Sequence, residues 1–158
     1  MRTFDQTEIA DFIAIQRLQA SYADIVTRRQ WPELAQVFLP DATVTIDVQE
    51  GTPFVLRTPQ GIGEFIDTSI ERFEFFEFVI LNSVIDFGPA GSGEATARLY
   101  MAELRQAREG GRRSTAFGLY RDTYVKRGDD WLIRERKYRS AARTAARELD
   151  VFGFELSE

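Results

Sequence analysis

The residue best suited by type and position to move a proton is Glu103. It lies within a run whose pattern is typical of a strand, Glu94–Arg108. The preceding apolar run, Phe75–Phe87, supplies Phe76 and Phe78 as its expected neighbours. A carboxylate among such side chains is desolvated, and desolvation raises its pKa towards the working range of a general acid or base. The alternative is a solvent-facing carboxylate paired with Arg105 or Arg121, because glutamate is mostly an exposed residue.

The composition limits the remaining chemistry. The chain of 158 residues has no histidine and no cysteine, so any acid–base catalysis would have to proceed without an imidazole. A metal would need an all-oxygen site, and the sequence has no Asp/Asn-rich loop of the calcium type. Gly61-Ile62-Gly63 lacks the third glycine and the preceding strand of a dinucleotide site. We therefore expect no metal and no cofactor.

Three helices are expected in the first half of the chain. Asp5 and Glu8 have the spacing of a capping box, which marks the start of the first helix. Trp31-Pro32 begins a short second helix that Pro40-Asp41 ends, and Thr58-Pro59 opens a third. The apolar residues at helical spacing are Ile15, Leu18, Tyr22 and Ile25/Val26 in the first helix and Ile62, Phe65/Ile66, Ile70 and Phe73 in the third. A strand between them places Val44, Ile46 and Val48 on one face, and a short segment, Phe54 to Arg57, follows it.

From Phe75 onward the apolar residues recur with period two, which indicates strands. The runs Phe75–Phe87 and Glu94–Arg108 far exceed the usual strand length of about five to six residues. A further strand begins at Trp131, and long strands twist and coil. We expect one α+β domain over residues 1–158, with a strongly curved, mostly antiparallel sheet whose concave side is closed by the helices.

Two arginine-rich segments need separate interpretations. Four arginines bracket a hairpin turn, and a solvated strand pair is favoured over an anion-recognising rim; they are Arg105, Arg108, Arg112 and Arg113. The stretch from Arg139 to Arg147 has arginines and alanines suited to a helix, and the apolar group Val151 to Phe154 follows it. We expect this tail, about residues 140–158, to cap either the pocket mouth or a subunit interface.

Several residues occur in a recognisable order: Tyr22, Trp31, Phe38, Asp41-Ala42, Asn82, Tyr120 and Trp131. This order resembles the SnoaL-like branch of the nuclear-transport-factor-two-like superfamily. That superfamily includes scytalone dehydratase, bile-acid dehydratases, ketosteroid isomerases and polyketide cyclases. The resemblance implies a cone-shaped sheet with three helices on its concave side.

The resemblance also assigns roles to single positions. It implies that Tyr22 points into the pocket, where its hydroxyl would stabilise developing negative charge; the alternative is that Tyr22 only belongs to the apolar stripe of the helix. Thr27 and Phe78 stand where dehydratase-like members carry an acidic residue and a histidine, so that dyad is absent here. Glu103 stands where related dehydratases carry an aspartate.

The candidate site thus has three catalytic candidates, Tyr22, Glu103 and Asp122. Some cyclase-like members use a strand carboxylate as acid and base, which is the role considered for Asp122; the alternative is a cross-strand partner for Arg134 or Arg136. The expected ligand contacts are Asn82, Phe78, Phe76, Thr27, Trp31 and Tyr120. Asn82 would either fix a ligand carbonyl or tie two strands together.

Two classes of function follow. The first is an acid–base enzyme without histidine, a dehydratase, isomerase or cyclase that acts on a hydrophobic, oxygenated ring compound. The second is a non-catalytic binding or assembly module in which Phe78 fills the position of the missing histidine. Both classes bind a small hydrophobic or aromatic ligand, and the fold alone does not distinguish them.

The net charge and the distribution of apolar residues indicate which partners and which location to expect. The net charge of −5 and pI near 4.9 argue against nucleic acid, which requires a clustered basic face. Residues 1–10 contain no long apolar stretch, so we expect neither a signal peptide nor a membrane span and place the protein in the cytoplasm. Both faces of Phe75–Phe87 are largely apolar, which predicts a homodimer. Phe75, Val79, Leu81 and Ile85 are expected on one face, and Phe76, Phe78, Ile80 and Val84 on the other.

Overall fold

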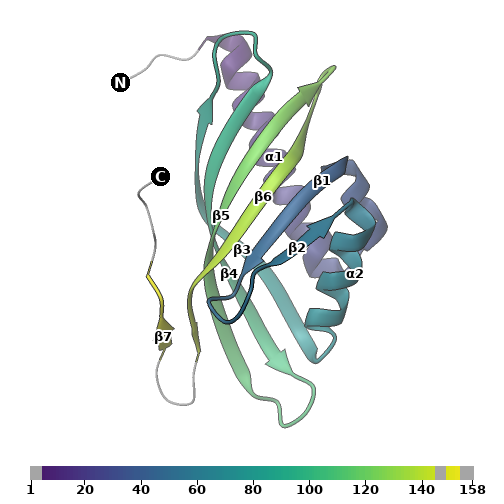
Figure 1. The fold of residues 1–158 in the computed structure, drawn as a ribbon, viewed down its shortest axis with the longest axis vertical. Helices are drawn as coiled ribbons and strands as arrows, with labels where there is room; N and C mark the ends of the chain where they lie inside the picture. The colour runs from purple at the N-terminus through teal and green to yellow at the C-terminus, as the bar shows by residue number, and fades with distance from the viewer. Residues whose placement is uncertain (1–4, 145–148, 154–158) are drawn as a thin grey trace.

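A curved seven-stranded sheet and three helices make up the computed structural model, which describes residues 5–144 and 149–153 (Figure 1). The elements are α1 (Gln6–Arg28), the 3-10 helix η1 (Trp31–Gln36), β1 (Phe38–Asp47), β2 (Phe54–Arg57), α2 (Pro59–Ile70), β3 (Phe73–Phe87), β4 (Glu94–Ala107), β5 (Arg113–Arg127), β6 (Asp130–Thr144) and β7 (Leu149–Val151). The strand order is β2-β1-β6-β5-β4-β3, and β7 pairs with β6. Only the β1–β6 pairing is parallel among the described strands. The α+β class and the curved, mostly antiparallel sheet are therefore confirmed.

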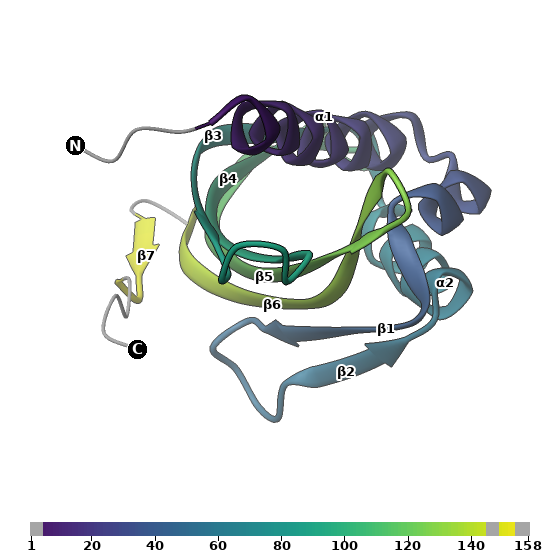
Figure 2. The ribbon, with the colours of Figure 1, turned by 90° about the horizontal axis from the view of Figure 1, so that it is seen from above.

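The helices close the hollow side of the sheet. Seen from above, α1 lies across the open side of the curl formed by β3, β4, β5 and β6, and α2 lies beside β1 and β2 (Figure 2). The predicted capping box is present, because Glu8 N donates to Asp5 Oδ1 at 2.8 Å and Asp5 N donates to Glu8 Oε2 at 3.3 Å. The predicted stripe of α1 is buried against the sheet. In the described residues no helix is long and apolar enough to cross a membrane.

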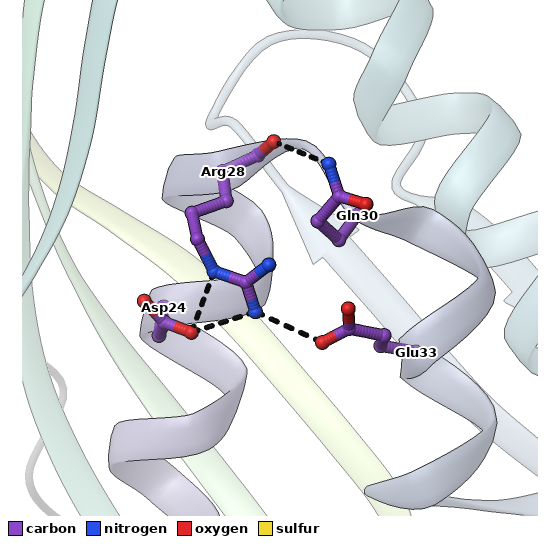
Figure 3. A network of polar contacts seen from close by, with 4 residues as sticks. All are labelled: Asp24, Arg28, Gln30 and Glu33. Carbon is purple, nitrogen blue, oxygen red and sulfur yellow. Dashed lines mark hydrogen bonds and ion pairs between the residues drawn. The ribbon is translucent and has the colours of Figure 1, made fainter.

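A polar network fixes the corner between α1 and η1 (Figure 3). Arg28 bridges Asp24 at 2.8 Å and Glu33 at 2.9 Å, so one guanidinium joins the two helices. Gln30 Nε2 donates to the carbonyl of Arg28 at 3.2 Å. Next to this corner, Arg29 adopts the left-handed conformation that ends α1 and donates to the carbonyl of Phe73 at 2.7 Å. The helix end is thereby tied to the start of β3.

The strand after η1 begins earlier than the sequence indicated. Pro40-Asp41 does not separate a helix from a strand; it lies inside β1. The parallel pairing of β1 with β6 shifts register between Phe38 and Thr43, and this irregular stretch tolerates a proline, which cannot donate a ladder hydrogen bond. Phe73, expected as the last residue of the apolar stripe of α2, instead begins β3.

An irregularity in β3 corrects the predicted assignment of its two faces. The register with β4 shifts between Ile80 and Asn82, which is a β-bulge. Before the bulge, Phe76 and Phe78 are buried, as alternation predicts. After it the alternation is inverted, so Ile85 is buried and Val84 is 39% exposed. The sequence placed Ile85 and Val84 on the wrong faces because alternation alone does not reveal an extra residue.

The C-terminal stretch is a strand where a helix was expected. β6 continues through Arg139 to Thr144. In this stretch four residues pair with β5; they are Arg139, Ser140, Ala142 and Arg143. β7 then folds back antiparallel on β6. Val151 is 72% exposed and Phe152 is 38% exposed, and neither lines the cavity described below. Residues 145–148 and 154–158, which include Arg147 and Phe154 of the expected tail, lie outside the described residues.

Candidate functional site

A cavity of about 440 Å³ lies between the concave face of the sheet and the helices. This volume is within the range of small-molecule sites. One wall is apolar and comes from β1, β2 and α2; it includes Val44, Ile46, Phe54, Ile62, Phe65 and Ile66. Polar groups of the lining come from α1 and from β4 to β6; they include Tyr22, Glu103, Arg105, Tyr120, Tyr138 and Ser140. A ligand here would contact both hydrocarbon and hydrogen-bonding groups.

The structure brings five of the nine candidate residues to this cavity. They are Tyr22, Phe76, Phe78, Glu103 and Tyr120. Tyr22 lies with its ring edge-to-face against Phe78, at a centroid distance of 5.4 Å, and 6.4 Å from the ring of Tyr120. Tyr22 therefore belongs both to the buried stripe of α1 and to the cavity wall, which combines the two alternatives considered for it.

The other four candidates do not line the cavity. The Thr27 hydroxyl accepts a hydrogen bond from Phe78 N at 3.1 Å, so the two positions of the absent dyad are in contact and join α1 to β3. Trp31 packs against α2, where a methyl group at Gly63 would lie 2.9 Å from its Cβ. Asn82 is exposed because the β3 bulge turns it away from the concave face.

Asp122, the fourth, forms a buried ion pair. Arg136 Nε donates to Asp122 Oδ1 at 2.7 Å, and Arg136 Nη2 donates to Asp122 Oδ2 at 2.6 Å. Both side chains are fully inaccessible to solvent. Tyr124 Oη donates to Asp122 Oδ2 at 2.5 Å, and Gln19 Nε2 donates to Tyr124 Oη at 3.0 Å. Of the two roles considered for Asp122, the geometry agrees with the cross-strand partner of Arg136, since both carboxylate oxygens are occupied.

Arg136 connects this buried pair to the cavity wall. Its guanidinium carbon lies 4.2 Å from the ring centroid of Tyr22 and 4.4 Å from that of Tyr120, within the range of cation–π contact. Burial raises the pKa of Tyr22, and the positive charge of Arg136 works against that increase. The sequence showed Arg136 only as a possible partner of Asp122; nothing in the strand pattern indicated that it would lie behind two tyrosines.

Glu103 faces the cavity from β4. Its side chain is 24% exposed, and its Oε2 lies 3.7 Å from Arg105 Nη1. Burial raises the pKa of Glu103, and the charge of Arg105 only partly offsets this. Burial and then the charge of Glu103 raise the pKa of Tyr138 to about 12, so this phenol remains protonated. The cavity therefore holds a carboxylate with raised proton affinity beside phenols that can donate hydrogen bonds.

Gly118 makes room for one of these phenols. A methyl group built on Gly118 would lie 2.1 Å from Cε2 of Tyr138, closer than atoms can approach. The glycine in β5 therefore lets the ring of Tyr138 lie flat over the strand and reach the cavity. Tyr138 was not among the sequence candidates, although the pairing of a strand glycine with a neighbouring aromatic residue is a recognisable signal.

Replacing Glu103 by glutamine should make the stability of the fold less dependent on pH. The folded state holds the Glu103 proton more tightly than the unfolded chain does, where the pKa is about 4.3. The resulting stabilisation is present below that value and is lost as the pH rises through the raised folded pKa. Glu103→Gln cannot titrate, so its free energy of unfolding should increase relative to wild type between about pH 4 and about pH 8. Urea unfolding at both pH values measures this, and a difference that does not change with pH would contradict it.

No group of three or more acidic side chains that could hold a metal ion occurs within residues 5–144 and 149–153. The groups that face the cavity can bind, orient and exchange protons with an organic molecule.

Comparison with known proteins identifies the fold and the family of this chain. The protein named "Probable cyclase FGR4" from Gibberella zeae is 28% identical over 130 residues, which cover 75% of this chain and 83% of that protein. The crystal structure named "Putative Scytalone Dehydratase" from Novosphingobium aromaticivorans has a TM-score of 0.78 at 20% identity, covering 96% of this chain and 98% of that one. The hexachlorocyclohexane dehydrochlorinase LinA-type3 from Novosphingobium barchaimii has a TM-score of 0.73 at 20% identity, covering 86% and 90%. Residues 7–137 match the model of the SnoaL-like domain, and the chain belongs to that family.

Proposed function

We propose that this protein is an acid–base enzyme of the lyase, isomerase or cyclase type that acts on a hydrophobic, oxygenated ring compound without histidine. The observation that carries the proposal is that Glu103 and Tyr22 line the same cavity. A carboxylate whose pKa is raised by burial is suited to take up and return a proton near neutral pH. A buried phenol is suited to donate a hydrogen bond to an oxygen that becomes negative.

The three reaction types share one step, the removal of a proton from a carbon next to a carbonyl group. In this step the Glu103 carboxylate takes the proton, the C–H electron pair forms a carbon–carbon double bond, and the carbonyl oxygen becomes an enolate oxygen. Tyr22 donates its hydrogen bond to that oxygen. Protonated Glu103 then returns the proton to another carbon in an isomerisation, or to a departing hydroxyl group in a dehydration. In a cyclisation the enolate carbon bonds to a second carbonyl carbon of the substrate, and the oxygen of that carbonyl takes the proton.

Arg136 serves as a positioning residue in this proposal. It does not line the cavity, but its guanidinium holds the rings of Tyr22 and Tyr120 from behind. Its charge also favours the hydrogen-bond donation of Tyr22, because it lowers the proton affinity of the phenol. Names of relatives support the chemical class: one is a cyclase, another a dehydratase and a third a dehydrochlorinase.

Deuterium exchange into 2-tetralone tests the proposal. This bicyclic ketone has an apolar ring, a carbonyl oxygen and exchangeable protons next to it, so it needs only the shared first step. Proton NMR in D2O measures the rate of exchange with and without protein. Exchange no faster than in buffer, together with measurable binding of the ketone, would favour the alternative function.

That alternative is a non-catalytic ligand-binding module on the same fold. The observation that favours it is the Phe78 side chain, which is buried against Tyr22 and Tyr120 at the cavity wall. Thr27 and Phe78 hydrogen-bond to each other as a structural pair, so the positions of the absent dyad hold no proton-transfer group. In this case Tyr22 and Glu103 would select the ligand and leave it unchanged.

We also propose that the protein is a homodimer through the convex face of β3 and β4. Apolar side chains are exposed on these adjoining strands, with Phe75 at 49%, Leu81 at 56% and Leu104 at 38%. Several large apolar side chains exposed on one face of a sheet are typical of an interaction surface. Light scattering should give a dimer for the wild type and a monomer for Leu81→Arg. Val55→Arg on β2, which is 59% exposed away from this face, is the control; a wild type that is monomeric at micromolar concentration would contradict the proposal.

A further inference from the structure

The charges that line the cavity are opposite in sign to the net charge of the protein. The chain carries −5 overall, yet the charged residues of the cavity lining are Arg72, Arg105, Arg143 and a single carboxylate, Glu103. Arg143 is neutralised by Glu50 and Asp150. Arg72 and Arg105 therefore leave the cavity with a positive excess.

Arg105 is the more informative of the two, because it is buried without adequate partners. Its side chain is only 15% exposed, and its ion pair with Glu103 at 3.7 Å is longer than a hydrogen bond. Its Nε is buried and has no hydrogen-bond partner among the described residues. Leaving a buried donor unsatisfied is costly, so the weakly paired Arg105 guanidinium retains hydrogen-bonding capacity that the described residues do not use.

Arg72 reinforces this positive site. The guanidinium carbons of Arg72 and Arg105 lie 5.0 Å and 5.4 Å from the centroid of the same ring, that of Phe73, which also lines the cavity. Arg72 is exposed and makes no side-chain ion pair within the described residues. Both positive charges thus lie beside the same ring, where an anion would be attracted by each of them. The sequence favoured a solvated position for Arg105, and the structure places it in the cavity wall.

We propose, resting on the proposed function of this cavity, that its ligand carries a carboxylate that Arg105 and Arg72 bind beside Phe73. The planar fork of N–H donors on arginine matches the two oxygens of a carboxylate, and the accessible part of the Arg105 side chain lines the cavity. The apolar wall of β1 and α2 would hold the ring of the same ligand. The substrate class is then a hydrophobic ring acid, with its acidic group at the arginines and its reacting carbon near Glu103.

A matched pair of probes tests this inference. Isothermal titration calorimetry compares 2-naphthoate with 2-naphthalenemethanol, which have the same ring and differ in the charged group. The wild type should bind the acid at least about tenfold more tightly than the alcohol, and Arg105→Met should remove that preference while the alcohol still binds. Arg72→Met provides a second variant at an exposed position that does not put folding at risk. Arg127→Met is the control, because it removes the same charge from an exposed position at the end of β5 that does not line the cavity.

The outcomes separate this inference from the proposed function. Equal binding of the acid and the alcohol to the wild type would overturn the inference and leave the hydrophobic pocket intact. A preference for the acid that persists in both Arg105→Met and Arg72→Met would also overturn it. Failure of both probes to bind at millimolar concentration would contradict the pocket itself, and with it the proposed function.

Discussion

Replacing Asp122 by asparagine should lower the free energy of unfolding by about 3–5 kcal/mol, because it leaves the charge of Arg136 buried without a counter-charge. Arg136 and Asp122 are both fully buried, so solvent cannot replace the lost carboxylate. Burial alone would lower the pKa of Arg136, and the Asp122 carboxylate outweighs this and keeps it protonated. Tyr124 would also lose the charged acceptor of its hydrogen bond. Urea unfolding followed by circular dichroism measures the loss.

Two further variants test whether the broken ion pair causes the loss of stability. The double variant Asp122→Leu with Arg136→Met should recover much of the loss, since removing both charges removes the uncompensated one. Glu94→Gln is the matched control; it breaks the pair with Arg134, whose side chains are 50% and 47% exposed, and should cost no more than about 1 kcal/mol. A cost for Asp122→Asn as small as that of Glu94→Gln would mean that Arg136 finds another partner.

The sequence predicted the helices and strands of this fold better than it predicted which side of the sheet each strand residue faces. The capping box at Asp5 and Glu8 and the spacing of the buried residues in α1 act locally, so they could be read directly from the chain. The long runs Phe75–Phe87 and Glu94–Arg108 were found close to the observed bounds of β3 and β4. The bulge after Ile80 could not be read in this way, because it arises from pairing with β4. It moved Asn82 out of the expected site.

The candidate site was predicted only in part, because strand pairing also decides which of its side chains face the cavity. Glu103 and Phe78 lie opposite each other across β3 and β4, before the bulge, so alternation placed both on the concave side. Arg136 and Tyr138 were not assigned to the site, because their places depend on the pairing of β6 with β5, which has its own register shifts. The prediction of a helix from Arg139 onward was wrong because strand pairing again decided the structure. The local preference for a helix was outweighed by the hydrogen bonds available from β5.

The largest expected effect on activity belongs to Glu103. If it is the proton-transfer group, Glu103→Gln should slow the deuterium exchange of 2-tetralone by about 10²–10⁴-fold, since glutamine cannot accept the proton. Tyr22→Phe should slow it by about 10²–10³-fold through the loss of one donor to the enolate oxygen. The pH profile gives a second readout. Because burial raises the pKa of Glu103, the wild-type rate should rise with pH around a midpoint above the ordinary value of about 4.3, and Glu103→Gln should lack this rise.

Glu109→Gln separates this chemical effect from a general effect of charge. Glu109 is exposed in the turn between β4 and β5 and does not line the cavity, so its loss changes the net charge equally but should leave the exchange rate near that of the wild type. Because glutamine has nearly the same shape as glutamate, Glu103→Gln should still bind 2-tetralone with an affinity close to wild type. Slow exchange with unchanged binding would then assign the loss to proton transfer. Wild-type rates in both Glu103→Gln and Tyr22→Phe would show that neither group takes part in the reaction, and that the cavity binds its ligand without transforming it.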